Sequence, residues 1–180
     1  MCPKENDHLS GRFRKYAAPE PYPEINVLKP NRAYAEILMD DYAGVISEFT
    51  AINQYLYHHY FFDIIDNQLA DLLEGVAVIE MYHLEILAEL IILLGGDPRI
   101  RGGESTKGKY WNSSFIGYGK TLCEQLDLDI RAEVEAIKNY EIHIQQIADP
   151  HIQAILRRII KDEEHHIVLF EEQKRRFKCR

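Results

Sequence analysis

The chain has 180 residues, of which 46% are hydrophobic and 28% charged, a composition that predicts a soluble globular domain and argues against a disordered chain. Its formal net charge of −8 argues against nucleic acid or an anionic membrane surface as the main partner. The longest apolar run, Leu90–Leu94, is too short to cross a membrane, and no basic segment followed by an apolar one marks a secretory signal. We therefore expect a cytoplasmic protein that does not bind membranes.

The three cysteines also fit a reducing compartment. Cys2, Cys123 and Cys179 form no Cys-x-x-Cys pair, which argues against a disulfide framework and against a thiolate site for zinc or iron. We expect Cys179 to be a free thiol near the end of the chain.

Proline is concentrated at the start of the chain. Five of the seven prolines lie in the first thirty residues, and proline disfavours a helical conformation in the residue before it. Residues 1–31 are therefore predicted to form an extended, non-helical arm. Two interpretations of this arm stay open: a mobile tail, or a strap across a partner subunit.

Four helices are predicted after the arm, because four segments are rich in helix-forming residues and have no internal proline. Asp66 or Asn67 is a suitable N-cap for the second helix, Gly95 fits the end of that helix, and Asp149 before Pro150 fits the start of the fourth. The predicted helices span residues 32–65, 68–95, 121–148 and 150–177.

A long connection separates the second and third helices. Seven of the ten glycines lie between Gly95 and Gly119, which predicts a crossover loop over about residues 96–120. Two short links and one long crossover are typical of a four-helix bundle built from two helical hairpins. The predicted fold is thus all-α, with residues 32–180 forming the bundle.

The second hairpin repeats the sequence pattern of the first. The segment Glu48–Tyr55 matches Glu133–Tyr140 at its Glu, Ala, Ile and Tyr positions, and the Glu-x-x-His motif of Glu80–His83 recurs in Glu163–His166. One hairpin used twice predicts an approximate two-fold axis through the bundle.

Each predicted helix places a glutamate in its apolar stripe. In the fourth helix, Glu163 and His166 continue the inward-facing series of Ile152, Leu156 and Ile159 at steps of three and four residues. Four buried carboxylates cost several kcal/mol each unless they are neutralised. Two divalent cations would balance their four negative charges, whereas no arginine or lysine lies in any of the four stripes.

With these residues the chain resembles the ferritin-like superfamily, in which two helices each supply a Glu and two others each supply Glu-x-x-His to a pair of metal ions. The resemblance covers about residues 34–177 and is strongest to rubrerythrins and bacterioferritins. It implies two metal ions per chain, iron more readily than manganese, with one histidine for each ion and Glu80 and Glu163 as bridging carboxylates. The implied ligands are Glu48, Glu80, His83, Glu133, Glu163 and His166.

Several features differ from these relatives. The sequence has no rubredoxin-like cysteine pairs, and Ala136 stands where rubrerythrins place an additional carboxylate, which argues against a rubrerythrin-type peroxidase cycle. Fourteen residues follow His166, too few for the fifth helix of cage-forming ferritins. Manganese catalases share the fold and the long crossover, but typically lack one of the six ligands.

A site rich in carboxylates, with two imidazoles, suits redox-active iron or manganese. We therefore expect an oxidoreductase that reacts with hydrogen peroxide or O₂, with an external electron donor if it is a peroxidase, and a homo-oligomer of two or more chains. Oxidation and storage of ferrous iron, or a protein that keeps metal for stability without turnover, are the alternatives. Whether the chain is an enzyme stays open at this point.

Further residues have both a structural and a functional interpretation. Tyr55 and Tyr140 are either hydrogen-bonded core residues or part of a relay beside the ligands. Met81 stands where bacterioferritins bind haem, although methionine is more often a packing residue. Asp162 is a candidate hydrogen-bond partner of a ligand histidine. Four further histidines are expected at the surface or beside the ligands: His58, His59, His143 and His165.

Overall fold

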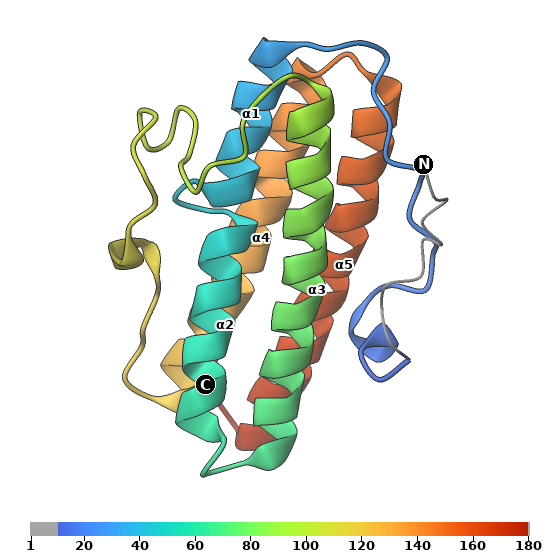
Figure 1. The fold of residues 1–180 in the computed structure, drawn as a ribbon. Helices are drawn as coiled ribbons and strands as arrows, with labels where there is room; N and C mark the ends of the chain where they lie inside the picture. Colours follow the sequence, from blue (N-terminus) through green and yellow to red (C-terminus); the bar gives the residue numbers. More distant parts are fainter. Residues whose placement is uncertain (1–10, 180) are drawn as a thin grey trace.

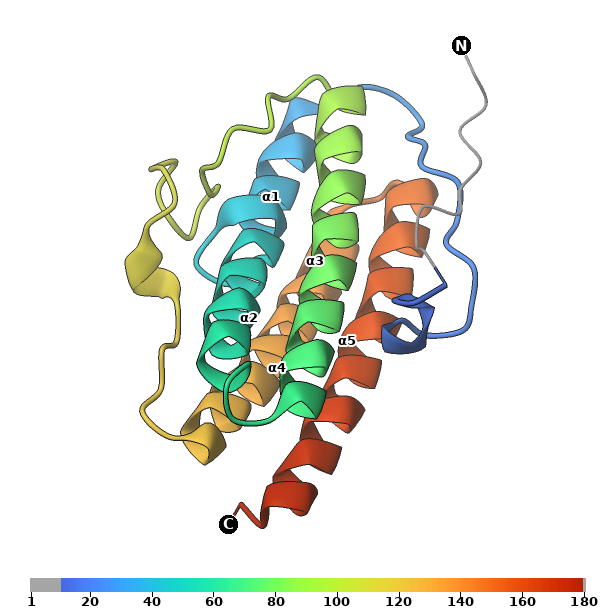
Figure 2. The same ribbon diagram turned by 60° about the horizontal axis from the view of Figure 1, so that its bottom comes forward.

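The computed structural model describes residues 11–179, which form an all-α bundle (Figures 1 and 2). The first and second helices together fill one position of the four-helix bundle, and two helical hairpins pack side by side, as predicted. No helix in this part of the chain is long and apolar enough to span a membrane. The helices are α1 (Arg32–Ala43), α2 (Glu48–Phe62), α3 (Asn67–Leu93), α4 (Leu122–Gln146) and α5 (Pro150–Phe177).

The first predicted helix, residues 32–65, is interrupted at residues 44–47, so the prediction of one continuous helix is wrong. Gly44 ends α1, and a Cβ atom at this position would lie 2.5 Å from the carbonyl oxygen of Asp40. Ser47 then starts α2 by accepting a hydrogen bond from the amide of Thr50. As a result Glu48 is the first residue of α2, where the helix dipole favours a carboxylate.

The other helix ends follow the predicted signals. Asp66 caps α3 by accepting from the amide of Leu69, and Gly95 follows α3 with a φ of 84°. Asp149 caps α5, whose first residue is Pro150. These local signals fix where each hairpin turns.

The long crossover between α3 and α4 runs along the outer side of α1 and α2 (Figure 1, yellow-green). The carboxylate of Asp40 accepts hydrogen bonds from the amides of Gly103, Glu104 and Ser105. Further along, the indole of Trp111 donates to the hydroxyl of Thr50 at 2.9 Å. The crossover is thus fastened to the bundle by polar contacts.

The arm packs against its own bundle from residue 11 onward. A short 3₁₀ turn at Arg14–Tyr16 interrupts its extended course, and Tyr16, Ala17 and Ala18 are buried. Gly75 of α3 makes room for this turn, because a Cβ there would lie 2.0 Å from the Tyr16 ring. The predicted arm is therefore part of the folded unit over residues 11–31, and residues 1–10 lie outside the described residues.

A disulfide joins Cys123 to Cys179, so the predictions of no disulfide and of a free thiol at Cys179 are wrong. The two residues are 56 positions apart in sequence, but the start of α4 and the end of α5 meet at one end of the bundle, with the two Cα atoms 5.5 Å apart. The bond closes the second hairpin at its open end.

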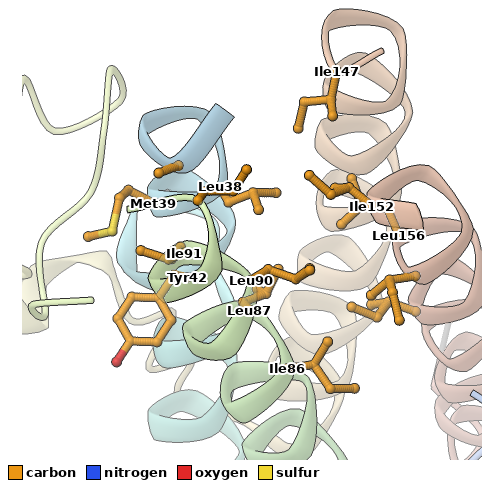
Figure 3. Close-up of a cluster of buried hydrophobic side chains, with 14 of the residues drawn as sticks. Leu38, Met39, Tyr42, Ile86, Leu87, Leu90, Ile91, Ile147, Ile152 and Leu156 are labelled. Atoms are coloured by element: carbon orange, nitrogen blue, oxygen red, sulfur yellow. The ribbon is translucent and has the colours of Figure 1, made fainter. Parts of the chain in front are cut away.

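Apolar side chains form two clusters along the bundle. One contains residues of α1, α3, α4 and α5, among them Leu38, Leu87 and Leu156 (Figure 3). The other contains residues of α2, α3, α4 and α5, among them Phe62, Val76 and Phe170. A buried polar layer lies between these clusters, and the candidate site lies there.

Breaking the disulfide should lower stability. Because closing a loop of this length restricts the unfolded chain, Cys179→Ser should reduce the free energy of unfolding by up to about 4 kcal/mol. Thermal or urea unfolding would measure the loss, and Cys2→Ser provides the matched control because Cys2 is not part of this bond. Equal stability of the two variants would contradict the prediction.

Candidate metal centre

The six residues predicted as ligands meet in the polar layer at the middle of the bundle. They form two overlapping groups of buried side chains, and within each group one ligand atom per residue lies within 4.8 Å of the others. The first group is Glu48, Glu80, His83 and Glu163, and the second is Glu80, Glu133, Glu163 and His166. Glu80 and Glu163 belong to both groups, which is the arrangement expected of carboxylates that bridge two ions.

The helical repeat explains this convergence. In each Glu-x-x-His motif the two side chains are one turn apart on the same face, so His83 Nδ1 lies 2.7 Å from Glu80 and His166 Nδ1 lies 3.0 Å from Glu163. Glu48 and Glu133 approach from α2 and α4 on the opposite side. Both histidines therefore point Nδ1 at the carboxylates.

Tyr55 and Tyr140 contact the glutamates reciprocally. The hydroxyl of Tyr55 on α2 donates to Glu133 on α4 at 2.7 Å, and the hydroxyl of Tyr140 on α4 donates to Glu48 on α2. Both rings are buried. The two-fold relation seen in the sequence thus extends to these hydrogen bonds, which orient the two glutamates that are not shared.

Burial strongly affects ionisation at the centre. Burial, and then the charges of Glu80 and Glu163, raise the pKa of both Glu48 and Glu133 well above the usual value. Burial also opposes ionisation of Glu80, but the neighbouring His166 and His83 outweigh it and lower the pKa of Glu80. Burial favours neutral imidazoles, yet the surrounding acidic groups raise the pKa of His83 and His166 well above the usual value.

The donor set fits two metal ions. Glu80 Oε1 and Glu163 Oε1 are buried and receive no hydrogen bond from the part of the chain that the structure describes. Two divalent ions would supply these oxygens with a partner and balance the four carboxylate charges. The clusters are compatible with iron or manganese, which accept mixed carboxylate and imidazole ligands.

Outside these groups, Asp162 contacts a predicted ligand. Its Oδ2 atom lies 3.0 Å from Nε2 of His83, as the sequence suggested. Arg158 pairs with the other oxygen of Asp162 at 2.7 Å and is buried, but it lies outside the inward-facing stripe of α5 that contains Glu163 and His166. Arg158 points toward the arm, because its guanidinium donates to the backbone oxygens of Ala18 and Glu20.

Tyr22 of the arm is a neighbour of the site that the sequence analysis missed. Its hydroxyl donates to Asp162 and lies 3.0 Å from Nε2 of His83. Burial raises the pKa of Tyr22, so the phenol stays protonated. A proline-rich segment has no helical register, and therefore its pattern does not indicate which residue faces the bundle.

The other histidines have varied surroundings. His58 is fully buried and pairs with Asp129 at 2.8 Å, and His143 pairs with Asp41 at the same distance. The first pair joins α2 to α4 and the second joins α4 to α1, while Nε2 of His58 lies 3.0 Å from the carbonyl oxygen of Gly117 in the crossover. Met81 is 43% exposed on α3.

A cavity of about 270 Å³ leads to the centre between α2 and α4. Its wall extends from the exposed Arg131 to the buried Glu48, Glu133 and Glu163. Ala136, the residue that replaces the additional carboxylate of rubrerythrins, also lines it. Small molecules therefore have a route to the polar layer.

The comparison with known families agrees with the fold. A model of the ferritin-like domain matches residues 45–179, which include all six predicted ligands. The chain belongs to the ferritin-like family.

Individual ferritin-like relatives differ in activity. A probable manganese catalase of Clostridium acetobutylicum is 26% identical over 167 residues, covering 83% of this chain and 73% of that protein. A bacterioferritin of Streptomyces coelicolor is 30% identical over 131 residues, covering 71% of this chain and 72% of that protein. The crystal structure of KatB, a manganese catalase from Anabaena, superimposes with a TM-score of 0.80 at 22% identity over 89% of this chain and 80% of that chain, and shows the fold.

Metal binding should release protons. Because the pKa values of Glu48, Glu133 and both histidines are raised, the metal-free centre holds protons that metal ions must displace. The apparent affinity for Mn²⁺ should therefore increase as the pH rises. Calorimetric titration in buffers of different ionisation enthalpy would count the protons, and an affinity independent of pH would contradict this prediction.

Proposed function

We propose that this ferritin-like protein is a dinuclear iron or manganese oxidoreductase that reacts with hydrogen peroxide or O₂. The observation that carries the proposal is the pair of overlapping donor groups that share Glu80 and Glu163 at the inner end of the cavity. The printed name of the Clostridium acetobutylicum relative, a probable manganese catalase, supports reaction with peroxide. Bound there, two redox-active ions would supply the two-electron change that cleavage or oxidation of a peroxide requires.

The chain's own residues hold and isolate the reacting centre. Glu48 with His83, and Glu133 with His166, serve as the ligands of one ion each in this proposal, and the shared glutamates serve both. The hydroxyls of Tyr140 and Tyr55 keep Glu48 and Glu133 oriented toward the centre. The apolar clusters on either side of the layer place low-dielectric surroundings next to it, which strengthens the electrostatic interactions between these groups.

Disproportionation of peroxide is the reaction that we favour. Two molecules of hydrogen peroxide yield two of water and one of O₂, so atoms and electrons balance without an external reductant. The cavity is large enough for so small a substrate, and the alanines of its α4 wall leave the passage open at Ala132 and Ala136. A peroxidase reaction would instead require an external electron donor.

Oxidation and storage of ferrous iron is the second candidate. The bacterioferritin relative supports it, and so does the acidic lining of the cavity, where Asp41 and Glu135 could guide cations inward. A third possibility from the sequence, a metal-stabilised protein without turnover, predicts metal binding without peroxide consumption.

We also propose a homo-oligomer of two or more chains that works in the cytoplasm. Exposed apolar side chains at Tyr60, Ile64 and Ile65 would suit contact between copies. The Cys123–Cys179 disulfide is unusual for a reducing compartment, so the location needs a direct test by fractionation of the source cells.

Oxygen evolution would test the proposed function. Purified protein loaded with manganese or iron should release O₂ from hydrogen peroxide and contain two metal ions per chain. Glu163→Gln should lose metal and activity, because it removes a shared carboxylate charge, whereas Glu164→Gln, the same change at the adjacent exposed residue, should retain both. Metal content by elemental analysis and O₂ by electrode are the two measurements.

The outcomes separate the candidates. More than two iron atoms per chain without O₂ release would favour storage, and two ions with background peroxide consumption would favour the structural alternative. A wild-type protein that takes up neither metal would refute the dinuclear centre.

Narrowing the cavity should slow the reaction without removing metal. Ala136→Leu adds three carbon atoms to the cavity wall, so kcat/KM for peroxide should fall several-fold while the metal content stays at two per chain. Ala148→Leu, in the exposed turn before α5, is the control. Unchanged kcat/KM for Ala136→Leu would show that substrate takes another route.

A further inference from the structure

The two halves of the centre have the same inner residues but different outer surroundings. Asp162 precedes Glu163 in α5, whereas Ile79 precedes Glu80 at the corresponding position of α3. Nε2 of His83 therefore faces the carboxylate of Asp162 at 3.0 Å. Nε2 of His166 is buried and has no hydrogen-bond partner among residues 11–179. The two predicted ligand histidines are thus held unequally.

The arm completes the contact on the His83 side. The Tyr22 hydroxyl donates to Asp162 and lies 3.0 Å from Nε2 of His83. Its ring contacts the guanidinium of Arg158, 4.1 Å from the ring centroid, and forms a T-shaped pair with Tyr82, with the two ring centroids 4.9 Å apart. These two contacts help to fix the position of the phenol.

The same carboxylate also anchors the backbone of the arm. Asp162 Oδ1 accepts a hydrogen bond from the amide of Ala18 at 2.7 Å, and Arg158, paired with that oxygen, donates to the carbonyl oxygens of Ala18 and Glu20. In each of the three hydrogen bonds between the arm and α5, the two residues are more than 130 positions apart in sequence, and the bond is buried or partly buried. Asp162 thus connects the arm directly to a predicted metal ligand.

We propose that Tyr22 is a positioning residue for the metal ion held by His83, and that docking of the arm and occupancy of this metal position strengthen each other. The inference rests on the proposed dinuclear centre. A hydrogen-bond partner on the outer nitrogen fixes the tautomer and orientation of a ligand histidine and increases its basicity. Such coupling is reciprocal, so a metal ion that favours the oriented His83 must favour the docked arm to the same extent.

The first consequence is unequal affinity of the two metal positions. Calorimetric titration of the metal-free protein with Mn²⁺ should show a tighter and a weaker site. Tyr22→Phe, which keeps the ring but removes the hydroxyl, should weaken the tighter site about tenfold and leave the other unchanged. Tyr82→Phe is the matched control, because this neighbouring ring packs against Tyr22 and its substitution leaves the Tyr22 hydroxyl in place.

The second consequence is protection of the arm by metal. Hydrogen–deuterium exchange of the peptide that contains Ala18 should slow when Mn²⁺ is added to the wild-type protein, because the Ala18 amide is bonded to Asp162. This measurement needs no variant and no activity assay. In Tyr22→Phe, whose folding is checked by thermal unfolding without metal, the protection by Mn²⁺ should be reduced.

The results distinguish this inference from the proposed function. Failure of the wild-type protein to bind Mn²⁺ or Fe²⁺ would refute the dinuclear centre itself. Two results would overturn the role of the arm and leave the centre intact. One is binding of two ions with the same affinities in wild type and Tyr22→Phe. The other is a hydrogen–deuterium exchange rate at Ala18 that does not change when Mn²⁺ is added.

Discussion

The burial of four carboxylates between two apolar clusters is the constraint on which the rest of the structure depends. Each buried ion costs several kcal/mol unless partners compensate it, which is comparable to the stability of a whole domain. The chain supplies some partners itself, through the two histidines and through the hydroxyls of Tyr55 and Tyr140. Oxygens of Glu80 and Glu163 are still without hydrogen bonds from residues 11–179, and metal ions are the partners that fit them. Four helices are needed to hold this layer, since each contributes one glutamate.

The interruption between α1 and α2 and the long crossover shape access to this layer. Val45, Ile46 and Ser47 line the cavity at the interruption, and Phe115 and Gly117 line it from the crossover. If the first helix were continuous, side chains at helical spacing would line this edge of the cavity in place of the non-helical residues 44–47. The crossover, which is held against the bundle through Asp40 and Trp111, lines another side of the cavity. Two departures from a regular bundle thus surround the route to the ligands.

The sequence predicted what short-range periodicity determines. Steps of three and four residues place Glu163 and His166 on the inner face of α5, whichever helices pack against it. The helix ends depend on local backbone conformation and hydrogen bonds, and they are marked by Asp66, Gly95 and Asp149. Features that depend on distant partners were missed. Cys123 pairs with Cys179 only because two helix ends meet, and Gly44 stands at a helix break where a Cβ atom would lie 2.8 Å from Ser105 of the crossover. Tyr22 reaches Asp162 only through the path of the arm.

The repeat also explains why family membership alone does not determine the chemistry. The repeated hairpin pattern places equivalent glutamates and histidines at the centre, and the ferritin-like relatives include both a probable manganese catalase and bacterioferritins. Beyond the six predicted ligands, the two halves of this chain differ in what reaches the centre and in what orients its histidines. In this chain those differences are the cavity lined by Ala136 and the contact of Asp162 with His83, which has no counterpart at Ile79. An arm that docks on this carboxylate breaks the two-fold symmetry and gives the two ions distinct environments, so that they need not change oxidation state with equal ease.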